Sequence, residues 1–423
     1  MAIRRLFEQR GAATIARGLG RSYGDAAQAA GGNVLDMTAM DDMGPIDTET
    51  GAVSVDAGVS LDALLRRVVP LGWFIPVSPG TRFVTVGGAI AADIHGKNHH
   101  RDGALGDHVL DLDLLSPDGE QRRVAPSTDA ELYWATVGGM GLTGVILRGT
   151  LRLLPIETSF MRVDTERASD LDDAMGRMDS GDRHYRYSVA WIDCLAGGGR
   201  LGRAVLTRGD HATLEELPMR GRSRLPTFAP KTWLTAPRWV PAVAVNRPTA
   251  RVFNEVWFRK APRMQRGRLQ SLASFFHPLD SVAEWNRLWG RGGFIQYQFV
   301  VPFGAESVLR QVLERLRRAH VPSLLAVLKR FGPEHGVLSF PLAGWTLALD
   351  MRADQEGLGR LLDGLDELVA AAGGRVYLAK DARLRPDVLE AMYPGLGRWR
   401  EIRARVDPTG VMRSDLARRL GLT

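Results

Sequence analysis

The chain has 423 residues, 45% of them hydrophobic and 24% charged, which is the composition of a folded protein too long for one hydrophobic core. The net charge of +7 suits an anionic ligand or an acidic lipid surface, and the aromatic-basic motifs of common nucleic-acid-binding modules are missing, so we expect no nucleic acid partner. A single cysteine, Cys194, excludes an intrachain disulfide, and its place at the end of an apolar stretch predicts a buried thiol.

The first third of the chain alternates short apolar runs with glycine-rich turns, a pattern typical of short strands. It predicts strands over 33–37, 52–57, 108–115 and 144–154. Helices are expected over 60–67, with Ser60 as N-cap, and over 129–134. The steady strand-helix alternation of a doubly wound sheet is missing, so the sequence predicts an α+β fold.

The amino-acid composition changes near residue 158, after which glycine clusters become rarer and aromatic and arginine residues become more frequent. Strands are predicted over 185–192 and 294–301, and amphipathic helices over 306–318 and 358–371. We therefore expect a second domain over 159–374.

The segment from 220 to 241 combines arginine and tryptophan with proline, which suits a solvated loop or the edge of a membrane. The first residues of the chain carry charge without the apolar stretch of a signal peptide, and no apolar run approaches a membrane span. We expect a protein that is cytoplasmic or peripheral to the inner membrane.

The first of four unusual segments is 16–25, where glycines alternate with larger residues. Such a loop can turn its N–H groups inward and bind a diphosphate, with Arg17 and Arg21 adding charge; a tight turn between strands explains it equally well. The segment also matches the G-x-S-x-G motif of serine hydrolases around Ser22. That motif needs an apolar strand before it and a helix after it, and the glycine-rich residues before Ser22 disfavour it.

The second and third segments are also rich in glycine. Small residues dominate 87–96, so this stretch suits close packing against a flat ligand. The segment 138–144 contains a literal G-x-G-x-x-G, but the alternating residues after it predict a strand, whereas a dinucleotide fingerprint opens a helix. The pattern therefore does not indicate a Rossmann fold.

The fourth segment, 95–100, carries three histidines. Two of them are four apart, but Gly96 and Asn98 weaken a helix and no carboxylate or cysteine completes a ligand set, so we expect no metal site. A role as polar groups in an active site suits these histidines better.

Together these segments resemble the FAD-binding domain of the vanillyl-alcohol-oxidase-like (PCMH-type) flavoproteins, and in particular the oxidase subunits of decaprenylphosphoryl-β-D-ribose 2′-epimerases. The matching stretches are 17–25, 79–100, 135–144, 294–299, 377–383 and 406–415. The resemblance implies a two-domain fold, with an FAD domain formed by 1–158 and 375–423 and an inserted sheet-plus-helices substrate domain over 159–374. Relatives carry several tens more residues at the N-terminus, so we expect the natural start to lie upstream.

The resemblance assigns FAD contacts to both glycine loops and to the residues that follow them. Arg21 stands where many relatives have a histidine bonded to the flavin, so non-covalent FAD is expected. The implied cofactor-binding residues are Ala16, Arg17, Gly18, Leu19, Gly20, Arg21, Ser22, Tyr23, Gly24, Asp25, Ala26, Gly80, Thr85, Val86, Gly87, Gly88, Ala92, Asp93, Ile94, His95, Ile146 and Tyr377.

The implied activity is FAD-dependent oxidation of the ribose 2′-hydroxyl of a polyprenyl-phosphate sugar to a 2′-keto sugar. A separate short-chain reductase would complete the epimerisation to arabinose, a cell-wall arabinan precursor. Oxidation of another sugar or polyol is the alternative, and a flavin-free protein that binds lipid-linked sugars is a third hypothesis. The phosphate of such a substrate agrees with the positive net charge.

The resemblance also implies roles near the sugar. Lys380 and Lys97 are candidate cations that would stabilise negative charge on the flavin or bind phosphate, and His95 or Lys380 is the candidate base. Gln298 and Lys329 are implied substrate-binding residues.

Three neighbours of the sugar depart from the family pattern. Relatives have tyrosine, asparagine and cysteine at the positions of Phe276, Thr346 and Ala348. We therefore expect a changed hydrogen-bonding pattern beside the sugar, and covalent inhibitors that need the cysteine should not attach.

Overall fold

The computed structural model describes residue 7 and residues 12–223, 225–232, 234–237 and 246–422. The α-helices of this part are α2 (Leu61–Val68), α3 (Val86–Ala91), α4 (His99–Asp102), α5 (Ala130–Thr136), α6 (Leu171–Gly181), α7 (Arg247–Lys260), α8 (Leu272–Phe276), α9 (Glu306–Arg318), α10 (Leu358–Ala371), α11 (Pro386–Met392), α12 (Leu396–Val406) and α13 (Asp415–Leu420). None of the helices described is long and apolar enough to cross a bilayer.

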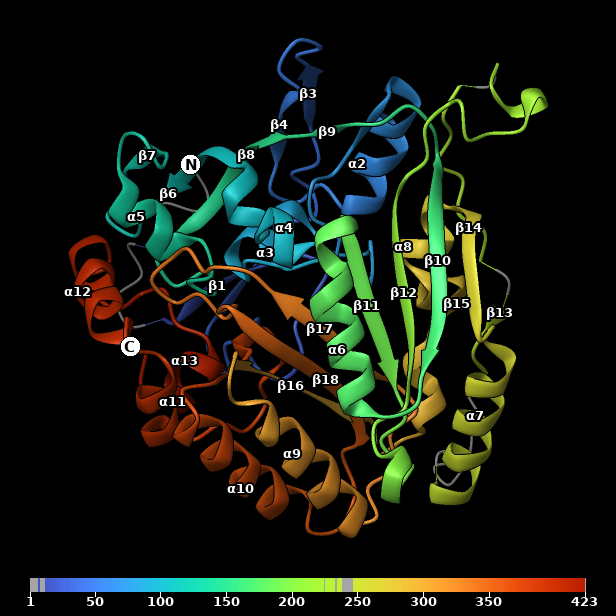
Figure 1. Ribbon diagram of the computed structural model, residues 1–423. Coiled ribbons are helices and arrows are strands. Elements are labelled where there is room, and N and C mark those ends of the chain that lie inside the picture. Colours follow the sequence, from blue (N-terminus) through green and yellow to red (C-terminus); the bar gives the residue numbers. More distant parts are fainter. Residues whose placement is uncertain (1–6, 8–11, 224, 233, 238–245, 423) are drawn as a thin grey trace.

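The strands divide between a large sheet and several smaller ones (Figure 1). Those of the smaller sheets are β1 (Thr14–Arg17), β2 (Asn33–Asp36), β3 (Met43–Ile46), β4 (Ala52–Asp56), β5 (Trp73–Phe74), β6 (Val109–Leu115), β7 (Gln121–Val124), β8 (Val145–Arg152), β9 (Leu154–Pro155), β13 (Leu234–Thr235) and β15 (Val282–Ala283). Those of the large sheet are β10 (Phe160–Ala168), β11 (Tyr187–Ile192), β12 (Ala204–His211), β14 (Met264–Ser271), β16 (Phe294–Pro302), β17 (Ala326–Phe331), β18 (Gly344–Arg352) and β19 (Arg375–Val376).

The two main sheets come from different parts of the chain. In the described residues, eight strands form one antiparallel sheet in the order β14-β10-β12-β11-β17-β18-β16-β19. Five strands form a second antiparallel sheet in the order β3-β4-β8-β6-β7. The mixture of helices with antiparallel sheets confirms the predicted α+β class.

Local sequence signals explain most of these elements. Ser60 caps α2 as predicted, since its hydroxyl accepts a hydrogen bond from the Ala63 N–H at 3.1 Å. The predicted helices over 306–318 and 358–371 are α9 and α10, with the same bounds. A strand, β8, follows the 138–144 glycines, which confirms that they do not open a dinucleotide-binding helix.

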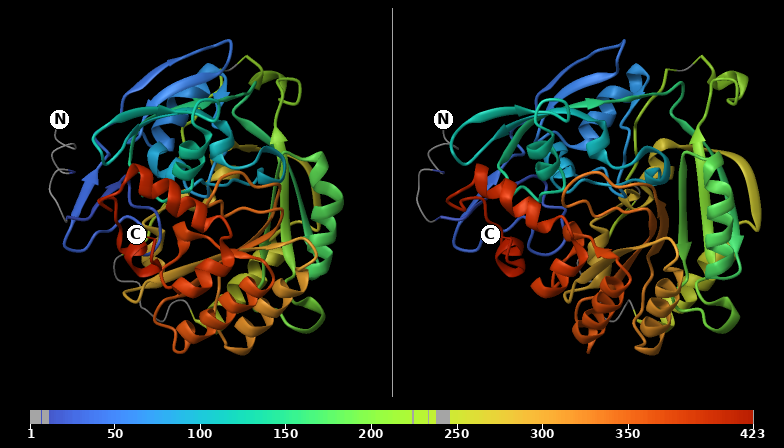
Figure 2. Two further views of the ribbon diagram at one scale, coloured as in Figure 1. Left: turned by 90° about the vertical axis from the view of Figure 1, so that its left-hand side faces the viewer. Right: turned by 60° about the vertical axis from the view of Figure 1, so that its left-hand side comes forward.

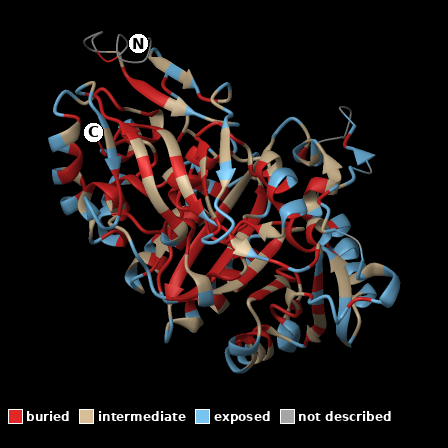
Figure 3. Cartoon of the chain, turned by 90° about the horizontal axis from the view of Figure 1, so that it is seen from above, coloured by how far each residue is buried: buried red, intermediate tan, exposed pale blue. Residues whose placement is uncertain are grey.

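The large sheet has one apolar and one more polar face along its central strands, because alternate residues of a strand point to opposite sides. Phe299, Leu347 and Leu349 are fully buried on the apolar side, and α9 and α10 pack against β16 (Figure 1). Figure 3 shows that buried residues concentrate along the strands, whereas exposed ones lie on peripheral helices and loops. The polar face is thereby free to form a site.

The two ends of the chain lie side by side. Thr14 pairs with Met412, and the Asp415 N–H donates to the Gln28 carbonyl at 2.8 Å. Figure 2 shows the C-terminal helices against the first strands. The domain boundaries near 158 and 375 stay a prediction.

The arginine- and tryptophan-bearing segment is described only in part. It contains a short 3-10 helix, η5 (Met219–Gly221), and strand β13, which pairs in parallel with β15. Trp233 and residues 238–241 lie outside the described residues.

Candidate active site

The first glycine loop follows β1 and has a backbone that requires glycine. Gly20 and Gly24 have φ angles of +61° and +67°, a region that residues with a Cβ rarely adopt. A Cβ on Gly24 would lie 2.3 Å from the Asp381 carbonyl oxygen, so the loop lies directly against the C-terminal part of the chain. The Tyr23 N–H reinforces this contact by donating to the Ala379 carbonyl at 2.9 Å.

The second glycine segment touches the first. Thr85 caps α3, with its hydroxyl accepting from the Gly88 N–H at 3.3 Å. A Cβ added to Gly18 would lie 2.0 Å from that hydroxyl oxygen, so only glycine fits. Gly80 has open space around it, and packing within the protein therefore does not explain its glycine. Two segments predicted to bind one dinucleotide thus lie in contact.

The residues after α3 lead to the centre of the site. Asp93 has a φ of +39°, and burial raises the pKa of its carboxyl group to about 7. The Tyr377 hydroxyl donates to the Ala92 carbonyl at 2.7 Å, which fixes this segment against the C-terminal part. Ile94 and Ile146 are buried nearby in the same hydrophobic core.

The polar face of the large sheet supplies another wall. Strand register pairs Gln296 with Asp350 and Gln298 with Ala348, and pairs Lys329 with Thr346. Since β16, β17 and β18 are neighbours and these residues fall on alternate positions, they share one face. This face brings together four of the predicted substrate-binding residues: Gln298, Lys329, Thr346 and Ala348.

His95 joins the glycine segments to this face. Its Nδ1 lies 2.9 Å from Lys329 Nζ, and its Nε2 lies 2.9 Å from the Gln298 amide nitrogen, which also donates to the Thr346 hydroxyl at 3.1 Å. The imidazole packs against the ring of Tyr377, at 5.5 Å between centroids. Burial, and then the charge of Lys329, hold the pKa of His95 well below its usual value, so the ring is neutral at pH 7.

The three predicted site lysines all lie near this network, and each has a lowered pKa. Burial lowers the pKa of Lys380 to about 8, opposed by the carboxylate of Asp350. Burial lowers the pKa values of Lys97 and Lys329 to about 7, and the charges of Lys380 and Lys97 contribute at Lys329. The charges of the three lysines thus act on a common region, in which Asp350 is the acid acting on Lys380. Such a site favours an anionic ligand.

Lys380 lies at the boundary between the first loop and the sheet. Its ammonium group is 4.1 Å from the centroid of the Tyr23 ring, and Tyr23 in turn packs edge-on against Phe294, at 5.4 Å between centroids. Burial raises the pKa of Asp350 to about 6, against a hydrogen bond from Gln296 that lowers it. The charges of Lys380 and Asp350 therefore influence each other's pKa values, and both groups titrate near neutral pH.

Lys97 and Phe276 form the next part of the site. Lys97 Nζ donates to the Phe275 carbonyl and lies 5.8 Å from the centroid of the Phe276 ring. Phe276 is fully buried and packs on Phe74 and Tyr187, at 4.8 and 4.9 Å between centroids. The ring that replaces the family tyrosine thus belongs to an aromatic cluster beside Lys97.

The sequence alone did not point to Asp350, to Gln296 or to Phe340, whose ring stacks on Tyr377 at 4.5 Å and lies 5.8 Å from the His95 ring, between centroids. The alternation of polar residues in Gln296-Tyr297-Gln298 and Thr346 to Asp350 marks one polar sheet face. A second signal is the rarity of lysine: of 55 basic residues only Lys97, Lys231, Lys260, Lys329 and Lys380 are lysines.

Two hypotheses from short motifs find no support in this geometry. The residues after Ser22 form turns rather than a helix, so the serine does not lie on a nucleophile elbow. His99 begins α4 while His95 precedes it, so the two are not on one helix face, and the described residues contain no group of three or more His, Cys, Asp or Glu placed to hold a metal. Cys194 is buried, as predicted.

Comparison with known proteins also indicates an FAD-binding oxidoreductase. An FAD-binding domain family model matches residues 1–125, and a D-arabinono-1,4-lactone oxidase model matches residues 350–420. Decaprenylphosphoryl-β-D-ribose oxidase of Mycolicibacterium smegmatis is 45% identical over 100% of this chain and 92% of its own. The chain belongs to the decaprenylphosphoryl-β-D-ribose oxidase family. It is an FAD-dependent oxidoreductase that acts on CH–OH groups.

Two further relatives show how far this similarity extends. An uncharacterised protein of Streptomyces coelicolor is 45% identical over 86% of this chain and all of its own. L-gulono-1,4-lactone dehydrogenase of Mycobacterium tuberculosis is 25% identical over 97% of this chain and 91% of its own. The more distant similarity, over 97% of this chain, thus extends well beyond the glycine loops.

Proposed function

We propose that this enzyme oxidises the 2′-hydroxyl of a polyprenyl-phosphate ribose to the 2′-keto sugar, the first half of an epimerisation to arabinose. A single arrangement carries the proposal: the network of His95, Gln298 and Lys329 faces the glycine loops, with Lys380 at its edge. Several donors for sugar hydroxyls, and the basic groups of Lys97 and Lys329 for a phosphate, are thereby gathered beside the loops expected to hold FAD.

FAD, when bound, supplies the hydride acceptor. The chain itself must orient the sugar and remove the hydroxyl proton. We assign that proton transfer to Lys380, because a pKa of about 8 keeps a useful fraction of neutral amine near neutral pH. The carboxylate of Asp350 raises this pKa against the larger, lowering effect of burial.

His95, the other candidate base, suits a positioning role better. With Lys329 charged, its ammonium donates to Nδ1 and the ring proton is on Nε2. The Gln298 amide, whose nitrogen lies 2.9 Å from Nε2 in the structure, must then turn over so that its oxygen accepts from Nε2–H. With Lys329 neutral, Nδ1–H donates to the amine and Nε2 accepts from the Gln298 amide. Both ring nitrogens are engaged in either state, so we infer that His95 orients Lys329 and Gln298 toward the sugar.

The remaining parts of the proposal concern partners and cofactor attachment. The keto sugar must be reduced on one face to give a single epimer. That step requires a second, hydride-donating protein, which we expect to be a short-chain reductase. A lipid-linked substrate requires peripheral contact with a membrane. FAD is expected to be non-covalent, since Arg21 stands at the position of the linking histidine.

Anaerobic flavin bleaching tests the proposal. A soluble short-chain prenylphosphoryl ribose should bleach the flavin, whereas its 2′-deoxy analogue should leave it oxidised. Bleaching by both, or equally by a range of free sugars and polyols, would favour oxidation of a different alcohol. A colourless protein that takes up no FAD would favour binding of lipid-linked sugars without chemistry.

A further inference from the structure

Helix α7 exposes the residues that an ordinary surface helix would bury. The fractions of surface exposed are 64% for Val252, 44% for Phe253, 59% for Val256 and 46% for Trp257. The residues of the same helix that face the protein are Ala250 and Asn254, which are buried. An apolar stripe turned toward solvent indicates a contact that the isolated chain does not make.

Positive charge surrounds the stripe. Along α7 the charged residues are Arg247, Arg251, Glu255, Arg259 and Lys260, four bases and one acid. Glu255 is engaged by Arg203 and Arg259, at 2.5 and 2.6 Å. Met264, at the start of β14, extends the exposed apolar surface with 59% of its own surface exposed. A helix that combines large apolar side chains, tryptophan and a basic excess has the composition of an interfacial membrane helix.

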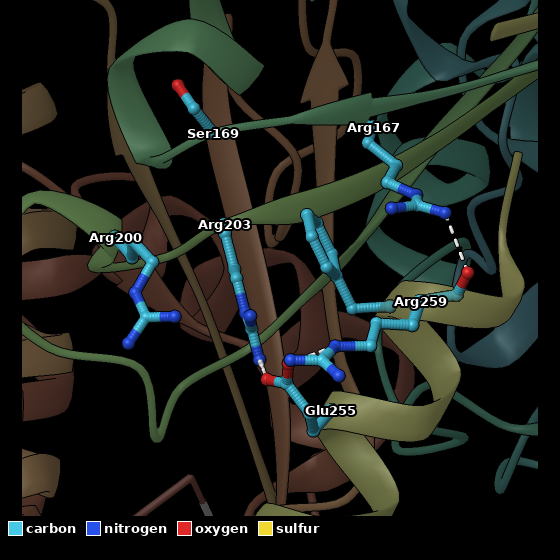
Figure 4. A pocket seen from close by; sticks show the side chains of 7 residues that line it. Arg167, Ser169, Arg200, Arg203, Glu255 and Arg259 are labelled. Atoms are coloured by element: carbon cyan, nitrogen blue, oxygen red, sulfur yellow. Dashed lines mark hydrogen bonds and ion pairs between the residues drawn. The ribbon is translucent and has the colours of Figure 1, made fainter. Parts of the chain in front are cut away.

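An arginine-lined hollow opens beside the helix, with a volume of about 370 Å³ (Figure 4). Arg167 donates to the main-chain carbonyls of Arg259 and Ala261, so its charge is not neutralised by a carboxylate there. Figure 4 shows Arg200 without a partner among the residues drawn. The hollow is therefore chemically suited to a phosphate group.

A second hollow, of about 400 Å³, adjoins the first and connects charge with the apolar stripe. It is lined by Arg200 and Arg251 together with Val252 and Val256. Two carboxylates also line it, those of Asp193 and Glu255, and Arg203 pairs with both, at 2.8 and 2.5 Å; Glu255 lines the first hollow as well. A phospholipid has this same pairing of chemistry, with an anionic phosphate next to hydrocarbon. A protein partner would not require arginine-lined hollows next to a continuous apolar stripe.

We propose that α7 and the adjoining arginine hollows form a docking surface for the anionic phospholipids of a bilayer. Val252, Phe253, Val256 and Trp257 enter the interface, and Arg167, Arg200 and Arg251 contact lipid phosphates. In Figure 1, α7, β14 and α8 lie on the same side of the molecule, and Phe275 of α8 is the contact of Lys97. The surface thus lies on the same side of the molecule as the helix that contacts the site lysine Lys97; delivery of a lipid-linked sugar from this side rests on the proposed function.

Vesicle co-sedimentation of the FAD-bound enzyme tests the docking surface. The wild type should bind phosphatidylcholine vesicles that contain phosphatidylglycerol, and should bind pure phosphatidylcholine much less. Phe253→Ser combined with Trp257→Ser should lower the partition coefficient at least about tenfold, since two large apolar side chains leave the interface. Val34→Ser combined with Leu71→Ser removes exposed apolar groups elsewhere and should leave binding unchanged.

Charge reversal provides the second test. Arg251→Glu combined with Lys260→Glu should abolish the preference for acidic vesicles, whereas Arg318→Glu combined with Arg360→Glu makes the same change in net charge on α9 and α10 and should not. Equal binding by both pairs, or no vesicle binding by the wild type, overturns the proposal. If the wild type is instead a dimer that the Phe253 and Trp257 changes convert to a monomer, the surface is an interface between copies.

The outcome is separable from the proposed reaction. The α7 variants should retain the flavin spectrum and should bleach with a soluble short-chain substrate as the wild type does. Intact vesicle binding without bleaching would overturn the proposed reaction alone.

Discussion

The molecule has two kinds of basic region, and they use different residues. Across the surface and between elements the base is almost always arginine, commonly within hydrogen-bonding distance of a carboxylate, as in the buried pair of Arg82 and Asp280 at 3.1 Å. Around His95 the base is lysine, and Lys97, Lys329 and Lys380 together represent three of the five lysines in the sequence.

The difference follows from proton affinity. Arginine stays charged at any pH a protein meets, so it suits permanent ion pairs and phosphate contacts, whereas burial readily lowers the pKa of lysine. The site lysines have pKa values near 7 or 8, within reach of proton exchange at neutral pH. A lysine at the site can therefore lose its proton near neutral pH, whereas an arginine elsewhere keeps its charge.

The largest expected effect tests this distinction at Lys380. Lys380→Ala should lower the rate of anaerobic flavin reduction by about a thousandfold, the usual contribution of a positioned base. Lys380→Arg should fail almost as badly, because a guanidinium keeps its proton. Both variants should stay yellow, and Lys231→Ala, at an exposed lysine, should reduce its flavin normally.

The arginine variant decides between two roles. If Lys380→Arg reduces its flavin at close to the wild-type rate, Lys380 acts through its charge and not as a base. If the alanine variant also matches the wild type, Lys380 has no part in the reaction.

The next largest effect concerns Arg82, whose permanent positive charge is paired with carboxylates. Its guanidinium lies between Asp280 and Asp62, at 3.1 and 2.6 Å, and is almost fully buried. Arg82→Met should lower the free energy of unfolding by about 3 kcal/mol, since it leaves buried carboxylates without their cation. Arg66→Met, which removes an exposed partner of Asp62, should change it by less than about 0.5 kcal/mol. Urea unfolding followed by circular dichroism measures both, and equal effects would contradict the comparison.

Asp350 allows the pKa of Lys380 to be moved without removing the lysine. The carboxylate raises the pKa of Lys380, so Asp350→Asn should lower that pKa from about 8. With neutral Lys380 as the base, the flavin reduction rate rises as pH increases through this pKa and then levels. The rising limb should therefore move to lower pH, by about one unit for a loss of roughly 1.4 kcal/mol of interaction. A limb that moves to higher pH, or does not move, would contradict the assignment.

The sequence predicted the local parts of this site better than its assembly. Ser60, the helices over 306–318 and 358–371 and the strand after Gly144 follow from capping and periodicity, which act over a few residues. The meeting of Gly18 with Thr85, and of His95 with Gln298 and Lys329, depends on strand register and on contacts between distant segments, which periodicity does not encode.

The family resemblance supplied residues that the pattern alone could not. It named Lys329 and Gln298, yet it gave no reason for their proximity, which comes from the register of β16, β17 and β18. Asp350 was missed because a carboxylate within a strand is indistinguishable from a solvated one until its burial is known. The exposure of the large apolar side chains of α7 was missed, because apolar positions in a helix normally predict its buried face.

The smallest expected effect tests whether Ala348 faces the site as register implies. Ala348→Cys introduces the thiol of the family pattern on the polar face, opposite Gln298, and should alter turnover by less than about threefold, since it removes no donor or charge. Cys194 is buried and its pKa is raised by burial, so the native wild type should not react with a thiol reagent. The variant should take up one label per chain, and a bound prenylphosphoryl ribose should protect it. Labelling that the substrate analogue does not slow would place residue 348 outside the sugar site.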